Sequence, residues 1–269
     1  MFLEEFAKTG TEADFEKKLR YLASMAEREV WDLNEKSMSY KYKKGTFILR
    51  KYILLTFDRC TNQDKIVYSK DKQHCAINTG LLTEKDSKDI YMMFDKNLYS
   101  GTTNVFGKKE QDWYFSGFKT ATDRDYIEAF GNEEPEMATY TEDVNDFYFN
   151  PNLRIEIDLD HIIDDNWDRI QDIVRLPKEV VRTMFGSSLI SALKRSKRNI
   201  RIAIPQFYND KIGFFLPIEM PVNDRQYVTL ALAIEKVGDM YRANTIFTLA
   251  DAYVKARRIM QVDNNWLLN

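Results

Sequence analysis

The spacing of apolar residues in the N-terminal third predicts helices before strands. From Phe15 to Ala26 apolar side chains recur every three or four positions, the spacing of one face of a helix. Thr11 and Asp14 precede this run at the spacing of a capping box, in which each residue bonds the other's backbone amide. The pattern therefore predicts a helix over about 12–29.

A second apolar run, residues 47–57, is followed by the pattern of a β-hairpin. The run is too long for an average strand and predicts a helix that ends near Asn62. Apolar segments at 66–69 and 75–77 then flank a polar turn at 70–73. A helix followed by a hairpin resembles the recognition helix and wing of a winged helix-turn-helix module. The alternative is a plain helix and hairpin packed on the rest of the domain.

Further strands and a division of the chain are predicted before residue 150. Residues 89–97 and 113–119 have the composition of strands, separated by a loop rich in Gly, Ser, Thr and Asn. The acidic stretch 131–145 lacks periodicity and fits a boundary or a lid. We place the division near residue 145, which gives an N-terminal helical, winged-helix-like domain over 1–145 and a C-terminal domain over 146–269.

The C-terminal part alternates between strand-like and helical patterns. Pro177 opens a helical pattern at its first turn, where a missing amide proton costs nothing. Thr248 and Asp251 form a capping pair before the last helix. The expected fold class is α+β, with a mostly antiparallel sheet and flanking helices on one side. The predicted strands are 153–159, 200–208, 212–219, 227–237 and 240–247, and the predicted helices are 178–196 and 249–260.

Composition and charge limit the classes of protein that fit. The chain has 269 residues, 44% of them apolar, and a formal net charge of −3. Any nucleic-acid binding must therefore come from a local patch and not from a bulk basic field. The longest apolar runs, such as Ile212 to Ile218, are far shorter than a membrane helix, and the N-terminus is acidic where a secretory signal is basic. We expect a cytoplasmic protein that does not span a membrane.

The chain has two cysteines, Cys60 and Cys75. Two thiols can build neither a disulfide framework nor a four-ligand zinc site. We expect both to be ordinary reduced thiols.

A series of short motifs carries a family resemblance over about residues 46–268. The residues that carry the resemblance are Ala76 to Leu82, Trp113, Gly117-Phe118, Asp160-His161-Ile162, Asn166, Ile204 to Tyr208, Leu216-Pro217, Leu230 to Glu235, Tyr241, Thr245, Thr248 to Tyr253 and Trp266-Leu267. In these residues the chain resembles an uncharacterised bacterial domain family of unknown function, which the resemblance associates with fused cold-shock and LOTUS-type modules and thus with RNA. The sequence departs from the family pattern at Val254-Lys255 and at Asp158, where asparagines are usual.

A dense basic run suggests a polyanionic partner. Five cations occur within eight residues, and the aromatic residues Phe207, Tyr208 and Tyr227 follow. Cations can neutralise phosphates and aromatic rings can stack on bases. The alternative is a solvated helix C-terminus, where the helix dipole favours cations. The basic residues are Lys194, Arg195, Lys197, Arg198 and Arg201.

Acidic residues alternate with apolar ones just after residue 154. In a strand, Glu156, Asp158 and Asp160 would share one face and could hold Mg²⁺ together with Asp164 or Asp165. The alternative is the solvated polar face of a half-buried strand. We assign no metal site, and Mg²⁺ enters only if the protein is an enzyme.

The second functional hypothesis is a nucleic-acid-processing enzyme. In it His161, beside Asp160, performs acid–base chemistry on a ribose hydroxyl or a phosphate, and Asn166 positions the substrate. The alternative for His161 is a structural histidine bonded to a backbone group.

A polar set on two predicted strands offers a pocket floor that could read a nucleotide. It requires strands 200–208 and 240–247 to lie in one sheet, and the alternative is an ordinary place at the sheet surface. The set is Gln206, Tyr208, Tyr241, Thr245 and Arg257.

Motifs for phosphate loops, dinucleotide binding, zinc proteases and serine hydrolases are absent from the sequence. The leading hypothesis is therefore an RNA- or nucleotide-binding protein without a cofactor, in which the basic run, Tyr208 and Gln206 bind the ligand. A third hypothesis is a protein-interaction module with an exposed patch of Tyr91, Phe94 and Trp113.

Overall fold

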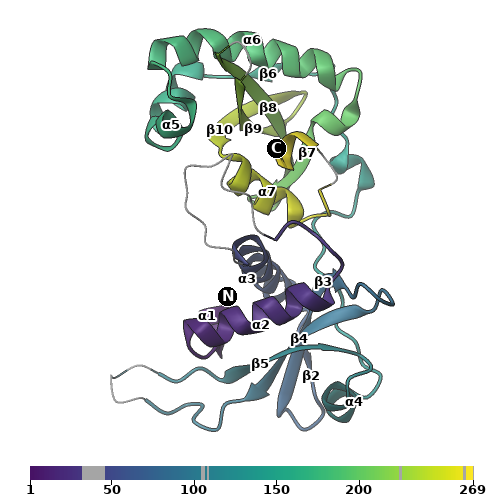
Figure 1. Ribbon diagram of the computed structural model, residues 1–269. Coiled ribbons are helices and arrows are strands. Elements are labelled where there is room, and N and C mark those ends of the chain that lie inside the picture. The colour runs from purple at the N-terminus through teal and green to yellow at the C-terminus, as the bar shows by residue number, and fades with distance from the viewer. Residues whose placement is uncertain (32–45, 104–106, 108, 224–225, 263–264, 269) are drawn as a thin grey trace. The chain divides into compact units, whose positions relative to one another are not determined.

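The chain folds into two compact units. The computed structural model describes residues 1–31, 46–103, 107, 109–223, 226–262 and 265–268 (Figure 1). Described residues up to Thr139 form the first unit, and those from Tyr140 onward form the second. Each unit contains one five-stranded sheet, so the fold is α+β in both.

The sheet of the first unit is antiparallel except at one edge. The strand order is β1-β5-β4-β3-β2, and only the pairing of β1 with β5 is parallel. The hairpin and strands predicted between residues 66 and 119 are all present. The strands are β1 (Ala7–Lys8), β2 (Val67–Tyr68), β3 (His74–Leu82), β4 (Asp89–Lys96) and β5 (Trp113–Thr120).

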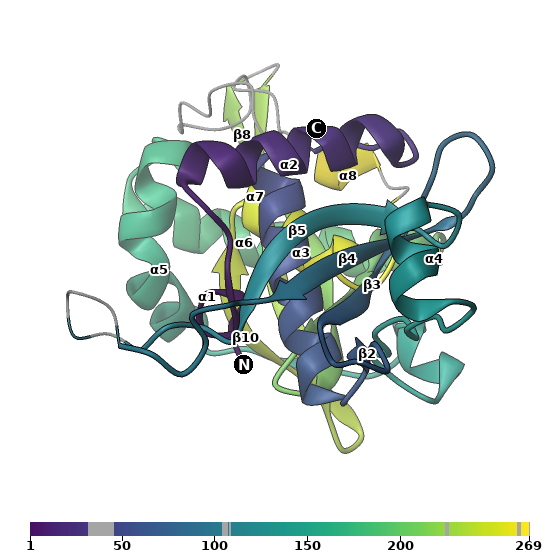
Figure 2. The same ribbon diagram turned by 90° about the horizontal axis from the view of Figure 1, so that it is seen from below.

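Helices cover both faces of this sheet (Figure 2). Figure 2 shows α4 (Arg124–Phe130) in front of the sheet and α3 (Phe47–Asn62) behind it. Phe57 of α3 packs on Phe94 of β4 with ring centroids 5.7 Å apart. Side chains alternate between the two faces along β4, so Tyr91 points to the opposite face of the sheet. There its ring stacks on that of Tyr126 of α4, with ring centroids 4.8 Å apart. The sheet therefore lies between two hydrophobic cores, one on each face.

The helices predicted in this unit are confirmed. The helix α2 spans Glu12–Met25, so it begins with the predicted Thr11–Asp14 capping box but ends four residues before the predicted end at 29, and α3 ends at Asn62 as expected. A short helix, α1 (Leu3–Phe6), precedes them. The winged-helix-like module is not confirmed, because the hairpin β2–β3 belongs to the five-stranded sheet and the apolar face of α3 is buried.

The exposed aromatic patch predicted for protein interaction is wrong. Tyr91, Phe94 and Trp113 are all buried, at 1%, 0% and 7% exposure. They lie on β4 and β5, whose two faces are both covered by helices or loops, so alternate positions of these strands are apolar on both sides.

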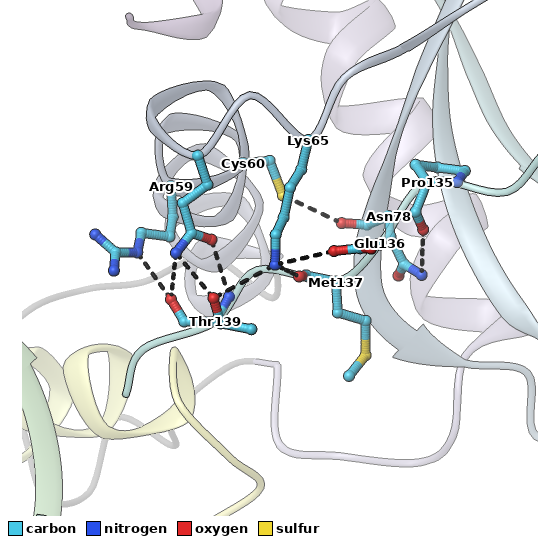
Figure 3. Close-up of polar contacts among 9 residues, drawn as sticks. Arg59, Cys60, Lys65, Asn78, Pro135, Glu136, Met137 and Thr139 are labelled. Atoms are coloured by element: carbon cyan, nitrogen blue, oxygen red, sulfur yellow. Dashed lines mark hydrogen bonds and ion pairs between the residues drawn. The ribbon is translucent and has the colours of Figure 1, made fainter. Parts of the chain in front are cut away.

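Hydrogen bonds hold the first part of the acidic stretch that was predicted as a boundary or lid. We call residues 133–139 the acidic strap. Figure 3 shows it beside the end of α3 and β3. Its backbone carbonyls accept hydrogen bonds from the side chains of Arg59 (2.9 Å to Thr139), Lys65 (2.7 Å to Met137) and Asn78 (3.2 Å to Pro135). Because side chains satisfy its carbonyls, this segment is held without belonging to a helix or strand.

The sheet of the second unit is mostly antiparallel, as predicted. The strand order is β6-β10-β9-β8-β7, with β6 parallel to β10 and the other pairs antiparallel. Asn209 and Asp210 both have positive φ in the two-residue turn from β7 to β8, as a type I′ turn requires. The strands are β6 (Ile155–Glu156), β7 (Ile204–Tyr208), β8 (Lys211–Asn223), β9 (Gln226–Val237) and β10 (Met240–Phe247).

Helices lie on both faces of this sheet and not on one side. Helices α5 (Leu159–Val174) and α6 (Lys178–Ser196) cover the face that carries Phe214 and Leu216. Phe215 points to the opposite face because side chains alternate along β8, and there it meets Phe247, which precedes α7 (Leu249–Arg257). Figure 1 shows α7 across the sheet from α6. The predicted capping pair of Thr248 with Asp251 is confirmed.

Three predicted strands in this unit have wrong boundaries, and one of them is β8, which ends at Asn223 and not at residue 219. The strand predicted over 153–159 is reduced to Ile155–Glu156, because Asp158 caps α5 by accepting a hydrogen bond from the His161 amide at 3.1 Å. The strand predicted from residue 200 begins at Ile204. Residues Ile200–Ile202 form a 3₁₀ turn, η3, in which the Asn199 side chain bonds the Arg201 amide.

One half of β8 has a strand on only one side. The partner strand β7 pairs with residues up to Phe215, and in the described part of the chain only β9 continues beside β8 after that point. The Glu219 carbonyl points away from β9 and accepts a hydrogen bond from Ser188 of α6 at 2.6 Å. Backbone direction repeats every two residues, so the nitrogens of Pro217 and Pro221 point the same way. Neither proline has an N–H to offer at this edge.

Both cysteines are free and buried. None of the described helices is long and apolar enough to cross a membrane.

Candidate nucleic-acid interface

The basic run wraps around the C-terminus of α6. This helix ends at Ser196, and Lys197 occupies its C-cap position. The guanidinium of Arg198 donates to the Lys194 carbonyl at 2.7 Å, and the Arg198 amide donates to the Arg195 carbonyl at 3.0 Å. Cations at a helix C-terminus are favoured because the terminal carbonyls carry partial negative charge. The run therefore stabilises the end of α6, whatever else it does.

Four of the five basic residues also reach solvent. Lys194, Lys197, Arg198 and Arg201 are exposed, and only Arg195 is half-buried, in an ion pair with Glu219 at 2.6 Å. Arg201 lies in the turn η3 and not in a strand, so it follows directly on the other exposed cations.

Charge is segregated along the second unit. Residues 141–179 contain eleven acidic and four basic residues, whereas residues 180–211 contain one acidic and seven basic residues. The end of α6 and the strands that follow it thus form a local basic region in a chain with net negative charge.

Tyr208 is the last residue of β7, and lysines from two other elements lie near it. Its side chain is 53% exposed. Lys255 of α7 places its Nζ 5.3 Å from the ring centroid, within the range of a cation–π interaction, and Lys211 is its cross-strand partner. Sequence reasoning missed Lys255 as part of this surface, because 47 positions separate it from Tyr208 and only the fold brings them together.

Gln206 is buried, whereas Tyr227 is exposed and is accessible to a ligand. Gln206 is 5% exposed and lies over Gly213, whose missing Cβ would come within 2.9 Å of its Nε2. Among the aromatic residues proposed to stack on bases, Phe207 is buried, whereas Tyr208 and Tyr227 are exposed. Tyr227 is the more exposed, at 67%.

The predicted pocket floor does not form. Cross-strand partners share a face, so Gln206, Gly213, Glu235 and Arg242 lie together. Tyr241 precedes Arg242 and therefore points to the other face.

On that other face, Tyr241 packs in the core with Phe149 and Phe214. Its hydroxyl accepts a hydrogen bond from the Asn150 amide at 2.9 Å, and burial raises the pKa of the phenol. Arg257 is buried as well, at 6% exposure. Tyr208 is thus the member of the predicted set that is left at the surface.

Asp160, His161 and Asn166 all lie on α5 but in different surroundings. Asp160 and His161 are 80% and 70% exposed; Asp160 forms an ion pair with Arg182 at 3.1 Å, and His161 Nε2 lies 3.1 Å from a carboxylate oxygen of Asp165. Asn166 is buried, donates to the Ile162 carbonyl and accepts from Thr245, both at 2.8 Å. The structure therefore separates Asn166 from the other two by placing it on the inner side of the helix.

The acidic residues predicted to share a strand face do not do so. Asp158 is the N-cap of α5, and Asp164 pairs with Lys178 at 2.6 Å and with Arg182 at 2.7 Å. The Lys178 ammonium lowers the pKa of the Asp164 carboxyl. Across the described ranges, no three His, Cys, Asp or Glu side chains are grouped so that they could hold a metal ion.

The cations of α3 contact residues of their own unit. Arg50 forms an ion pair with Glu12 of α2, and Arg59 bonds the acidic strap. Lys51 lies over the ring of Phe47 at 4.4 Å.

Comparison with known proteins gives one family. No curated protein and no solved structure matches the chain. The family model described as "Domain of unknown function (DUF3825)" matches residues 22–266, which include strands β2 to β10, the basic run and Tyr208. Since the match spans most of the sequence, the chain belongs to this family of domains of unknown function.

Proposed function

We propose that the second unit binds single-stranded RNA, or a related nucleotide polyanion, at the end of α6. The observation that carries the proposal is the clustering of exposed Lys194, Lys197, Arg198 and Arg201 within eight residues, in the most basic part of the chain. Such a cluster can neutralise successive phosphates.

Two exposed tyrosines suit bases better than a duplex backbone. Tyr208 and Tyr227 each offer a ring face to solvent, and Lys255 and Lys211 add positive charge beside Tyr208. Stacking on an aromatic ring needs an unpaired base, so a single strand is the better ligand class. The association of similar domains with cold-shock and LOTUS-type modules, which the sequence resemblance implies, points to the same ligand.

The test is a titration of labelled single-stranded RNA against the full chain at several salt concentrations. We expect affinity to fall steeply with salt. The double variant Lys197→Glu and Arg198→Glu should lower affinity at least tenfold near 0.1 M salt and reduce the slope of log K against log salt by about 1.4, since each single-strand contact contributes about 0.7.

The matched control carries the same change in net charge in the first unit, as Lys70→Glu with Lys85→Glu. Both lysines are exposed and lie in turns. Equal loss of affinity in the two double variants would show that only bulk charge matters and would remove the basic run from the site.

Tyr208→Ala should weaken binding by about 1–3 kcal/mol, whereas Tyr208→Phe keeps the ring and should bind nearly as wild type. The same RNA, incubated and separated on a denaturing gel, reports any cleavage. Cleavage that disappears in His161→Ala would favour the enzymatic hypothesis for the exposed His161–Asp165 pair.

A further inference from the structure

A groove lies between α6 and the half of β8 that extends beyond the end of β7. It has a volume of about 370 Å³, and Ser191, Arg195, Pro217, Glu219 and Tyr227 contribute to its walls. This size falls at the lower end of small-molecule sites. Arg195 belongs both to the basic run and to the groove, so the two are continuous.

The groove differs from the basic run in charge. Glu219 brings a carboxylate into it, 2.6 Å from the guanidinium of Arg195, and the two side chains are 35% and 42% exposed. The ion pair is thus locally neutral, and the carboxylate disfavours a phosphate at this point. A ligand group in the groove must instead donate hydrogen bonds to Glu219.

The Glu219 carboxylate can accept further hydrogen bonds. Oε2 of Glu219 lies 2.6 Å from the Arg195 guanidinium, and an ionised carboxylate offers about four lone-pair sites, so acceptor sites remain for a ligand. Among the four RNA bases, guanine alone presents two neighbouring donors, N1–H and N2–H₂, on its Watson–Crick edge. The other bases present one donor group there, so a bidentate contact with a carboxylate selects guanine.

The groove also supplies a surface on which a base can stack. Tyr227 lines it with a ring that is 67% exposed, and Pro217 adds an apolar face on β8. The hydroxyl of Ser191, one turn before Arg195 on α6, is exposed beside them.

We propose that this groove binds a guanine base of single-stranded RNA, with Glu219 accepting from N1–H and N2–H₂ and Tyr227 stacking on the ring. The inference rests on the proposed function, because the basic run would hold the phosphates next to that base. It adds base preference to a surface that would otherwise bind any sequence.

The test uses four uridine octamers that differ at one central position, which is U, A, C or G. Wild-type protein should bind the G-containing octamer about tenfold more tightly than the other three, as one good bidentate contact provides. Glu219→Gln should bring the four affinities to within about twofold. It should also steepen the salt dependence for the all-U octamer by about 0.7, because Arg195 is released to contact phosphate.

Controls separate the two proposals. Glu235→Gln removes a half-buried carboxylate from the same sheet but outside the groove and should keep the preference for G. Equal affinities for the four octamers in the wild type would overturn the guanine site and leave the proposed function standing. Binding of none of them would overturn both. A preference for G that survives in Glu219→Gln would remove Glu219 as its source.

Discussion

At the scale of single residues, two glycines of the second unit show opposite uses of a missing side chain. Gly213 lies on β8 beside strand β9, and a Cβ there would come within 2.5 Å of the Ile234 carbonyl oxygen. Gly186 is inside α6, and a Cβ there would meet nothing within 4 Å. The first glycine is required by a close approach of backbone, whereas the second only weakens its helix.

Substitution by alanine should therefore change the free energy of unfolding in opposite directions at the two positions. Gly213→Ala should lower the free energy of unfolding by about 1–3 kcal/mol, because backbone must shift to admit the methyl group. Gly186→Ala should raise it by about 0.5–1 kcal/mol. Urea denaturation of the full chain measures both, and a loss of stability in Gly186→Ala would contradict the open surroundings of that position.

The buried thiol of Cys60 predicts a loss of stability in alkali. Burial raises the pKa of Cys60 to about 11 from its usual 9.0. In the unfolded chain the thiol ionises first, so its contribution is complete below pH 9 and is lost as pH rises towards 11. The loss amounts to about 2 kcal/mol by pH 11.

Denaturation of wild type and Cys60→Ala at pH 8 and pH 11 tests this. The variant should be less stable at pH 8 because of the cavity, but its stability should fall by about 2 kcal/mol less between the two pH values. Equal falls in both proteins would show that the Cys60 thiol does not contribute.

Structural features that depend on residues close together in the sequence could be predicted. Features that depend on contacts across the sheet could not. The capping pairs Thr11–Asp14 and Thr248–Asp251 span three positions and were both predicted correctly. The burial of Gln206 and the approach of Lys255 to Tyr208 depend on strand pairing and on the placement of α7, which no local pattern encodes.

At the scale of elements, α5 shows why a strand and a helix can be confused at their junction. Ile155, Ile157 and Leu159 alternate with polar residues as in a strand, and this alternation led to the wrong prediction. The helical spacing of buried Ile163, Ile170 and Val174 begins only afterwards. The long pattern is the stronger signal, since it spans four turns and the alternation spans five residues.

The acidic strap makes a prediction about proteolysis. Gln63 and Lys65 follow α3, and their side chains bond Thr139 and Met137, so replacing them as Gln63→Ala with Lys65→Met should free the strap. A protease that cuts after glutamate should then cleave between residues 133 and 137 several times faster than in wild type, because cleavage requires local opening. Mass spectrometry of the fragments locates the cut.

Lys70→Met is the control for this variant, since Lys70 is exposed in the β2–β3 turn and away from the strap. It should be cleaved at the wild-type rate. Unchanged cleavage in the double variant would show that other contacts, such as that of Tyr91 with Glu134 at 2.6 Å, suffice to hold the strap.

At the scale of the whole molecule, the chain has two sheets that share no strand. One core cluster of the second unit is built from buried residues between 149 and 246. Apolar and acidic patterns predicted the existence of a division, because the periodicity stops at the acidic stretch 131–145. The pairing order within each sheet could not be predicted, since it depends on contacts far apart in the sequence.

Damage to one core should therefore stay within one unit. Phe94 is fully buried among the aromatic rings of Phe6, Phe57 and Phe115, and Phe94→Ala should destabilise the first unit by about 3–5 kcal/mol. Hydrogen exchange measured by mass spectrometry should show faster exchange in peptides before residue 139 and unchanged exchange in β8 and β9. Equal acceleration in both units would show that they unfold together.

The prolines of β8 have a consequence for how this molecule behaves in crowded conditions. A long strand with one open side is normally a template on which other chains add strands, and this is a common route to fibrils. At Pro217 and Pro221 the template lacks two of its donors, and Ser188 occupies the Glu219 carbonyl between them. Molecules gathered at high density would thus be hindered from pairing their sheets with those of their neighbours.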